Sequence, residues 1–310
     1  MPAKLSVHVP GEAVIVRVLA DDSGIVIGRD PACAVAIAHD SVSRRHAELC
    51  SAGPGTWSLT DLGSKNGIRV DGERVAAAEL SGSRWFAVGD VFCEFECVDA
   101  AGVEHLAMRA AERRSSSMAW TRRLQADVRG DSLIADLLRG IVDIAECRRG
   151  FLLVPDAQSQ MRVRACYALQ PDEVGRSAFS GSRSAVERTI QHRRAVFLSD
   201  QRDRAWLQGQ ASVIARDIRA LACLPLQQDG RLLGVAYADT DDEAKVFTDL
   251  DAELLEAFVG HAAAALAASE LDVTLAGMAA LLAVDEAGAA HSTGAAPYWA
   301  PAAARSDQRA

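Results

Sequence analysis

The sequence predicts an all-β sandwich at the N-terminus, followed by an α+β domain built on an antiparallel sheet flanked by helices. Over residues 5–99, runs rich in valine, isoleucine and leucine recur about every 8–12 residues between clusters of glycine, aspartate, serine and proline, a spacing typical of sandwiches. From residue 131 onward, helical periodicity alternates with strand-like runs, which is typical of α+β domains. The length of 310 residues accommodates two domains and a connecting segment.

Short strand-like runs make up the first domain, 5–99. One of them, at 68–70, is followed by Asp71 and Gly72. A type I′ hairpin turn requires positive φ at both central positions, which Asp-Gly provides, so we expect a hairpin there with 73–75 as its second strand. The predicted strands cover 13–18, 25–28, 34–37, 46–50, 57–62, 68–70 and 92–98.

A basic, helix-permissive segment, 100–130, follows the first domain and is predicted to be an interdomain helix or linker. In the second domain, 131–270, apolar residues recur at helical spacing around 134–142 and again from Thr248 onward. Between these helices the sequence predicts strands at 151–154 and 161–169, a helix at 182–194, and strands at 196–198, 220–226 and 232–239.

The segment 271–310 is predicted to be a helical extension and a disordered tail. Leu271, Leu275, Met278 and Leu282 have the spacing of coiled-coil a and d positions over two heptads. A helix lying on its own sheet and a dimer seam both fit this pattern. Beyond about residue 285 the alanine-rich, low-complexity composition predicts disorder.

Composition and motifs exclude several classes of function. With 33 basic and 42 acidic residues, the formal net charge of −9 argues against a nucleic-acid-binding protein. No lysine follows a glycine, so the chain contains no P-loop. No apolar run reaches the roughly 18 residues of a membrane span, and the start MPAKLSVHVP does not resemble a secretion signal. We therefore expect a cytoplasmic protein that contacts no membrane.

The cysteines predict neither zinc binding nor disulfides. There are seven, an odd number, and no two form a CxxC pair, so a zinc site is not expected. They lie mostly in apolar runs, which indicates buried free thiols in a reducing compartment.

Three motifs in the first domain point to a single chemistry. They are Gly28-Arg29, the segment Ser41-Val-Ser-Arg-Arg-His46, and the segment Ser64-Lys-Asn-Gly67. Each follows a predicted strand, where a rigid sandwich presents side chains to a ligand. Arginine binds two phosphate oxygens at once, and short hydroxyl and amide donors fill the remaining lone pairs. The predicted loops 28–29, 43–46 and 64–69 contain the bases Arg29, Arg44, Arg45, Lys65 and Arg69 and no acid.

In this order and at these separations, the three motifs resemble those of the forkhead-associated (FHA) domain, a β-sandwich that binds phosphothreonine peptides. The resemblance implies phosphate contacts from Arg29, Ser43 and Ser64, with Arg44 and Lys65 as supporting cations. It also implies that Asn66 bonds the peptide backbone, and that Gly28, His46 and Gly67 hold the loops in shape. One position differs, because Ile68 stands where the family usually has threonine.

His46 has an alternative interpretation as a catalytic base. No GxSxG or other nucleophile motif accompanies it, so a structural imidazole is favoured. The sequence therefore predicts a protein that is not an enzyme, with no catalytic residues, no metal and no cofactor.

The second domain resembles a GAF domain, a small-molecule-sensing and dimerisation fold related to PAS. The resemblance rests on the order of elements and on the segments 222–226 and 230–239, followed by Phe247 and Asp251 at the start of the closing helix. The segment Asp239–Phe247 lacks the NKxnFxxxDE pattern of cyclic-nucleotide GAF domains. The segments 222–226 and 230–239 are markers of the fold, and the sequence assigns no small-molecule ligand to this domain.

An FHA domain before a GAF domain resembles the regulatory half of bacterial signalling proteins, including sigma-54 activators, without their AAA+ motor. The resemblance implies a non-catalytic signalling adaptor that binds a phosphothreonine protein or a Ser/Thr kinase, with a GAF domain that forms a homodimer or binds a metabolite. The alternative is a small-molecule or redox sensor, or a transcription-related regulator, in which the GAF ligand is primary.

Overall fold

The computed structural model describes residues 1–20, 24–126, 130–156, 158–169, 180–199 and 218–269. The chain forms two units, Met1–Leu266 and Ala267–Ala310, and the description below concerns the first. The predicted coiled-coil positions and the predicted disordered tail lie outside the described residues.

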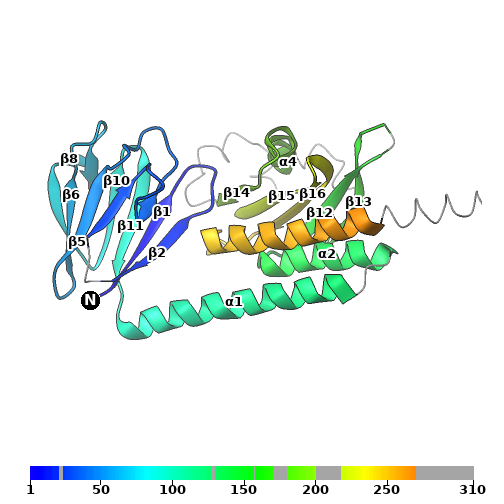
Figure 1. Cartoon of the computed structure of the whole chain (residues 1–310), viewed down its shortest axis with the longest axis horizontal. Helices are drawn as coiled ribbons and strands as arrows, with labels where there is room; N and C mark the ends of the chain where they lie inside the picture. The colour runs from blue at the N-terminus through cyan, green and yellow to red at the C-terminus, as the bar shows by residue number, and fades with distance from the viewer. Residues whose placement is uncertain (21–23, 127–129, 157, 170–179, 200–217, 270–310) are drawn as a thin grey trace, which may run out of the picture. The chain divides into compact units, whose positions relative to one another are not determined.

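Two packed sheets form the first domain (Figure 1). One has the order β2-β1-β11-β10-β7-β8 and the other β4-β3-β5-β6-β9, and all pairings are antiparallel except β3 with β4. The strands of the first sheet are β1 (Ala3–His8), β2 (Ile15–Leu19), β7 (Ile68–Val70), β8 (Glu73–Val75), β10 (Ser83–Val88) and β11 (Val91–Cys97). Those of the second are β3 (Ile25–Gly28), β4 (Val35–Ala36), β5 (Ala47–Gly53), β6 (Thr56–Asp61) and β9 (Ala77–Ser81).

The core of this domain lies between the two sheets. Leu5 and Phe95 from the first sheet and Leu49 and Trp57 from the second are fully buried. The rings of Trp57 and Phe95 pack edge to face, with centroids 6.0 Å apart. Apolar side chains therefore alternate toward one interior, as period-2 strands require, and the predicted sandwich is confirmed.

The predicted strands were incomplete. β1, β9 and β10 lie outside the predicted runs, and the run predicted at 34–37 contains only the two-residue strand β4. β10 was missed because its four apolar residues are consecutive, with Trp85 exposed and Phe86, Ala87 and Val88 buried, so its sequence shows no period-2 alternation. The hairpin prediction is confirmed, because Asp71 and Gly72 have φ values of 51° and 87° between β7 and β8.

A single helix, α1 (Ala100–Ala126), follows the sandwich. The serine triplet at 115–117 lies inside this helix, which agrees with the helical alternative for the connecting segment. Only Ser117 and Leu124 of α1 are buried, so most of its surface is exposed.

The second domain is a five-stranded antiparallel sheet of order β13-β12-β16-β15-β14 (Figure 1). Helix α2 (Gly130–Ile144) and the helix at 249–269 cover one face of this sheet, and α4 (Ser180–His192) covers the other. The strands are β12 (Arg149–Pro155), β13 (Met161–Tyr167), β14 (Val196–Ser199), β15 (Ala220–Gln228) and β16 (Arg231–Thr240). The predicted α+β architecture is confirmed.

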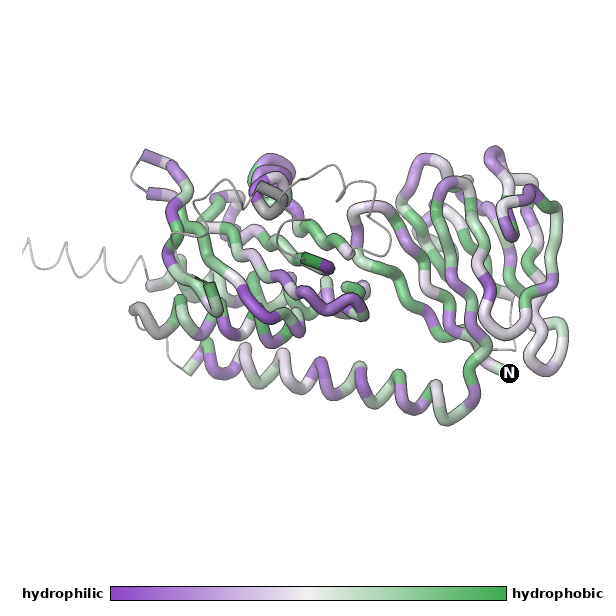
Figure 2. The backbone as a smooth tube through the Cα atoms, turned by 180° about the vertical axis from the view of Figure 1, so that it is seen from behind, coloured by the Kyte–Doolittle hydropathy of each residue, from purple (hydrophilic) through white to green (hydrophobic). Residues whose placement is uncertain are grey.

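Hydropathy along the backbone follows these layers (Figure 2). Strands β15 and β16 are almost continuously buried because helices cover both faces of the sheet. On the α4 side, Phe151 stacks on Tyr237 with centroids 4.6 Å apart. On the other side, Gly140 of α2 allows close packing, since a Cβ there would lie 2.4 Å from the Phe258 ring.

None of the seven cysteines forms a disulfide bond, and the sequence analysis overestimated their burial. Only Cys93 and Cys223 are fully buried, and the other five are partly exposed. Apolar neighbours in the sequence do not ensure burial of a residue whose strand turns that side chain toward the edge of the core.

Candidate functional site

Three loops of the sandwich meet, and each carries one of the motifs identified in the sequence. The N–H of Arg29, directly after β3, donates to the carbonyl of Ser43 at 2.9 Å, and the N–H of Asp30 donates to that of Arg44 at 3.1 Å. The N–H of Lys65 donates to Ser43 Oγ at 3.1 Å. We call this site the loop cluster; it comprises residues 28–30, 41–46 and 62–67.

His46 joins two of these loops from inside the domain. Its side chain is fully buried, and its Nδ1 accepts a hydrogen bond from the N–H of Ser43 at 3.0 Å. Its Nε2 lies 3.0 Å from the carbonyl oxygen of Gly67. Because Nδ1 accepts, the ring proton is assigned to Nε2, which donates to Gly67. With both nitrogens bonded to backbone, the imidazole holds the loops together and is not exposed to a substrate.

Gly28 allows two of the loops to approach closely. A Cβ at this position would lie 2.2 Å from the carbonyl oxygen of Arg44 and 3.0 Å from the Cα of Arg45. Both atoms belong to the backbone, so no side-chain rotation would relieve the clash. A side chain here would push the loop with Arg29 away from the loop with Ser43.

The hydroxyls of Ser43 and Ser64 each accept a hydrogen bond from the backbone of the loop cluster. Ser43 Oγ accepts from Lys65 N, and Ser64 Oγ accepts from the N–H of Gly67 at 2.9 Å. Gly67 itself has a φ of 74°, which favours glycine. A hydroxyl that accepts from a fixed amide still has its own proton to donate, so both serines are oriented donors.

Asn66 is held by a residue for which the sequence analysis assigned no role. Its Nδ2 donates to the carbonyl of Ser41 at 2.7 Å, while Ser41 Oγ accepts from the N–H of Asp90 at 2.9 Å. A Cβ at Gly89 would lie 2.5 Å from that same Ser41 carbonyl oxygen. The Gly89-Asp90 turn thus positions Ser41, and Ser41 positions Asn66. Only the Gly-Asp pair, a turn signal, hints at this in the sequence.

The cations of the loop cluster are exposed and have no acidic partner in the part of the chain that the structure describes. Arg29, Arg44, Arg45 and Lys65 are exposed, and among the described residues none of them forms an ion pair. The Nε of Arg29 donates to the carbonyl of Val42 at 3.3 Å, which leaves the terminal nitrogens of its guanidinium to bind a ligand.

Arg69 does not belong with these cations, contrary to the count of bases made from the sequence. Its guanidinium donates to the carbonyl of Gly89 and pairs with Asp90 at 3.4 Å. The strand β7 places Arg69 beside the turn after β10, and a neighbouring acid neutralises it there.

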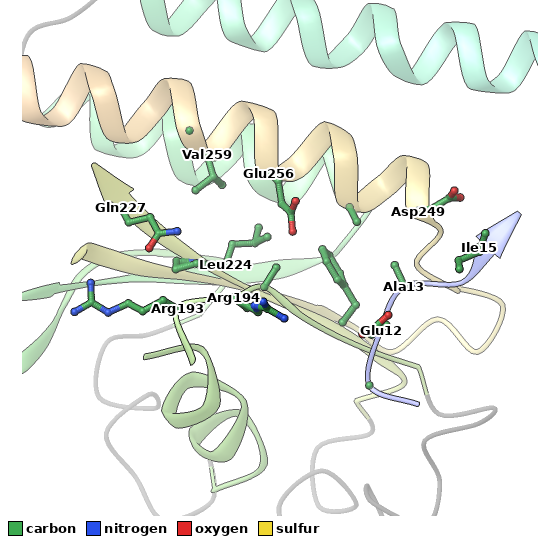
Figure 3. A pocket seen from close by; sticks show the side chains of 16 residues that line it. Glu12, Ala13, Ile15, Arg193, Arg194, Leu224, Gln227, Asp249, Glu256 and Val259 are labelled. Atoms are coloured by element: carbon green, nitrogen blue, oxygen red, sulfur yellow. The ribbon is translucent and has the colours of Figure 1, made fainter. Parts of the chain in front are cut away.

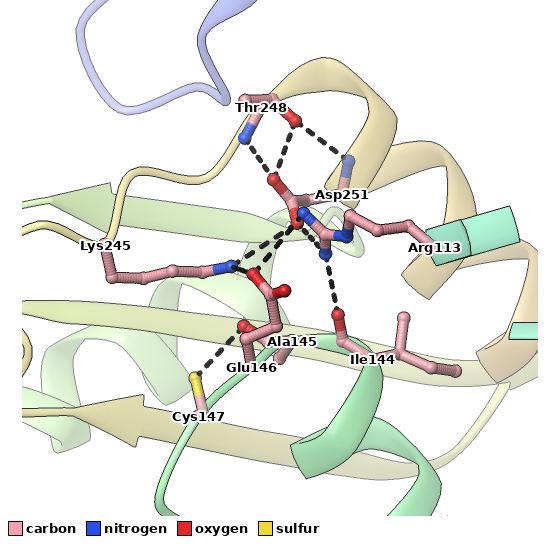
Figure 4. Close-up of polar contacts among 8 residues, drawn as sticks. All are labelled: Arg113, Ile144, Ala145, Glu146, Cys147, Lys245, Thr248 and Asp251. Carbon is pink, nitrogen blue, oxygen red and sulfur yellow. Dashed lines mark hydrogen bonds and ion pairs between the residues drawn. The ribbon is translucent and has the colours of Figure 1, made fainter. Parts of the chain in front are cut away.

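A second cluster of charged residues lies in the other domain (Figure 4). Asp251 is fully buried and forms ion pairs with Arg113 of α1 and, at 3.5 Å, with Lys245. Lys245 also pairs with Glu146 at 2.8 Å. We call these four residues the buried ion cluster; it contains two cations and two carboxylates.

The buried ion cluster is held by further hydrogen bonds. Asp251 Oδ2 accepts from the N–H and the hydroxyl of Thr248, at 2.6 and 2.7 Å, as a capping box at the start of the helix at 249–269. Arg113 donates to the carbonyl of Ile144 at the end of α2, at 2.8 Å. Although burial opposes ionisation, Lys245 and Arg113 hold the pKa of Glu146 below its ordinary value.

Three cysteine thiols have raised pKa values. Burial raises the pKa of Cys223 to about 12. Burial also raises the pKa of Cys147, which lies beside the buried ion cluster, and that of Cys50. A thiol is nucleophilic as the thiolate, so the raised pKa values lower the fraction of reactive thiolate at these three positions near neutral pH.

A cavity of about 670 Å³ lies beside the sheet of the second domain (Figure 3). Leu224 and Val259 provide apolar walls, and Arg194 and Glu256 provide charged groups. Residues of the β1–β2 connection, including Glu12, also line it. Burial raises the pKa of Glu256.

Among the described residues no group of three or more His, Cys, Asp or Glu side chains is arranged to hold a metal ion. No helix within the described ranges is long and apolar enough to cross a membrane.

Comparison with known proteins agrees with this geometry. A family model for the FHA domain matches residues 25–89, which contain the loop cluster, and a model for the GAF domain matches residues 131–267. The chain therefore belongs to the proteins that carry an FHA domain. A GAF domain follows it, so this is an FHA–GAF protein.

Several solved structures that are similar to part of the chain are FHA domains. The FHA-1 domain of Mycobacterium tuberculosis Rv1747 is 30% identical over 31% of this chain and 97% of that chain, with a TM-score of 0.27. The FHA domain of the CT664 protein from Chlamydia trachomatis is 24% identical over 32% and 100%, with a TM-score of 0.30. Mycobacterium tuberculosis EmbR, solved with a low-affinity phosphopeptide, is 26% identical over 31% and 24%, with a TM-score of 0.27. Among the curated proteins, no sequence matches the chain.

Proposed function

We propose that this protein is a non-catalytic signalling adaptor that binds phosphothreonine-containing proteins at the loop cluster. The observation that carries the proposal is the exposed group of cations, which have no acidic partner within the described ranges, next to two serine hydroxyls fixed by backbone amides. A phosphate dianion needs both features: charge-assisted hydrogen bonds from cations, and short donors that are already oriented.

Each residue has a proposed role. The guanidinium of Arg29 binds phosphate oxygens, and the hydroxyls of Ser43 and Ser64 donate to the same group. Asn66, which Ser41 orients, bonds the backbone of the bound peptide, and its side-chain oxygen has no other hydrogen-bond partner among the described residues. The exposed Arg44 and Lys65 add positive potential around the site.

The adaptor proposal extends to the whole chain. The phosphopeptide-binding domain covers 5–99, the connecting helix 100–130 and the GAF-like sensory domain 131–270. The partner is a phosphothreonine protein or a Ser/Thr kinase, and the protein acts in the cytoplasm. The GAF domain modulates docking by forming a homodimer or by binding a small molecule. The FHA and GAF matches support a regulatory role, and neither match indicates a catalytic family.

The test is the binding of the full chain to a phosphothreonine peptide library and its unphosphorylated counterpart. Arg29→Ala removes a charge-assisted bond worth about 1.5–3 kcal/mol, so affinity for selected peptides should fall roughly 10- to 150-fold. Arg84→Ala is the matched control, because Arg84 is exposed in the same domain but pairs with Asp71. Equal binding of unphosphorylated peptides would refute the proposal.

The cavity beside the GAF sheet favours a second candidate function, in which a small molecule is the primary signal. Its volume of about 670 Å³ lies within the usual range of ligand pockets, about 300–1,000 Å³. The raised pKa values of Cys50, Cys147 and Cys223 disfavour the redox version of this idea at those thiols. Native mass spectrometry of the purified chain tests it: a bound small molecule that Arg29→Ala retains would support this candidate.

A further inference from the structure

Helix α1 has one face that is fixed to the second domain. Arg113 reaches the buried Asp251, and Arg123 pairs with Asp136 of α2 at 2.8 Å. Ser117 and Leu124, on the same side of the helix, are buried. The orientation of α1 about its own axis is therefore set, and the opposite face must point away from the domain.

That opposite face carries a regular stripe of exposed residues. Its positions step along α1 by three and four residues, the a and d spacing of a coiled coil, over three heptads. Met108 and Met118 are 58% and 53% exposed, although methionine is usually buried. We call this the outer stripe; it consists of Ala101, Glu104, Met108, Ala111, Ser115, Met118 and Arg122, all exposed.

The charges of the outer stripe are complementary to those of a second copy in one orientation. Consider two α1 helices that lie antiparallel, with their outer stripes in contact and the two-fold axis at the height of residue 113 along each helix. Glu104 then faces Arg122, Met108 faces Met118 and Ala111 faces Ser115. In a parallel pair, Glu104 would face Glu104 and Arg122 would face Arg122, and like charges in contact repel. Neither Glu104 nor Arg122 forms an ion pair among the described residues.

We propose that the outer stripe is the seam of an antiparallel homodimer of this protein. A two-fold interface must be self-complementary, so that each residue pair occurs twice, and the outer stripe meets this condition with two Glu104–Arg122 pairs at its ends. The small side chains of Ala111 and Ser115 at the centre allow the two helix backbones to approach closely. This seam rests on the homodimer named in the proposed function, which it assigns to residues of α1, and it uses no residue of the loop cluster.

Charge reversal tests the seam in the full chain by sedimentation equilibrium. Glu104→Arg and Arg122→Glu each place like charges opposite one another at both ends, so each should weaken the dimer by about tenfold or more. The double variant Glu104→Arg/Arg122→Glu restores opposite charges and should recover the dimer to within about threefold of the wild type. A monomeric wild type, or a double variant no better than the single ones, would overturn the proposal.

Cysteine cross-linking tests the orientation. Chains with Ala111→Cys should form a disulfide with chains carrying Ser115→Cys when the two are mixed, whereas Ala111→Cys alone should not link to itself. Peptide mapping distinguishes these bonds from any made by the native cysteines. A disulfide between two Ala111→Cys positions would show a parallel seam and overturn the proposal. Phosphothreonine-peptide binding by the same variants separates failure of the seam from failure of the proposed function.

Discussion

The loop cluster and the buried ion cluster both contain arginine and lysine, but the fold treats these cations in opposite ways. In the loop cluster, Arg29, Arg44 and Lys65 are exposed, and none has an acidic partner among the described residues. In the buried ion cluster, Arg113 and Lys245 are largely buried and contact two carboxylates. A basic residue can bind an external phosphate only where the fold has left its charge uncompensated.

The same comparison separates binding from stability. Removing an exposed cation leaves no buried charge behind, so it should affect a ligand and not the fold. Removing one partner of a buried pair leaves an uncompensated charge in the interior, which is strongly destabilising. Substitutions in the loop cluster should therefore weaken ligand binding without changing stability, and substitutions in the buried ion cluster should lower stability without changing binding.

The largest expected effect is on stability, from Arg113→Ala. Asp251 is fully buried and would lose its closest cation, so the free energy of unfolding should fall by about 3 kcal/mol. Chemical denaturation measures this. The control is Arg114→Ala, which removes the exposed neighbour on the same helix and should change stability by less than about 0.5 kcal/mol. Equal effects of the two substitutions would show that the ion cluster is not structural.

A smaller effect, on both the stability of the fold and the affinity for phosphopeptides, is expected from Gly28→Ala. The added methyl would meet the Arg44 carbonyl at 2.2 Å, so the loops must separate, which costs about 1–3 kcal/mol. Phosphopeptide affinity should fall as well, because Arg29 moves away from Ser43. Gly24→Ala is the matched control, since its Cβ would meet side chains and no backbone, with Glu48 Oε1 at 3.0 Å and Cys50 Sγ at 3.3 Å.

The smallest effect is a pH dependence of the buried ion cluster. Because the pKa of Glu146 is lowered in the folded state, its ion pairs stabilise the fold above the unfolded pKa of 4.5, and this contribution is lost as the pH falls through the lowered value. Glu146 is about half exposed, so Glu146→Gln should cost less than about 1 kcal/mol at pH 7. The difference from the wild type should shrink as denaturation is repeated below pH 4.5, and a difference that grows instead would contradict the assignment.

The residues of the loop cluster could be predicted from the sequence, and those of the buried ion cluster could not. Gly28, Ser43, His46 and Asn66 lie in short motifs whose residue types already indicate turns and phosphate donors. The contact between Arg113 and Asp251 joins residues from distant parts of the sequence, and no local pattern records it. The partnership of Arg69 with Asp90 was missed for the same reason.

The strands of the fold also differ in how well the sequence predicted them. Strands with strong apolar runs, such as β15 and β16, were predicted because burial on both faces leaves a continuous signal. β10 was missed because its exposed and buried residues form two halves and do not alternate along the strand. The outer stripe of α1 became visible only when Arg113 and Leu124 had fixed which face of the helix is turned inward.

The most direct test is a calorimetric titration of one library-selected phosphothreonine peptide into the wild type, Arg29→Ala and Arg113→Ala, below the unfolding transition of each. Arg29→Ala should bind at least about tenfold more weakly with unchanged stability, whereas Arg113→Ala should bind like the wild type despite its lower stability. Wild-type affinity in Arg29→Ala, or equal binding of the unphosphorylated peptide, would contradict the assignment of the loop cluster as the phosphate site.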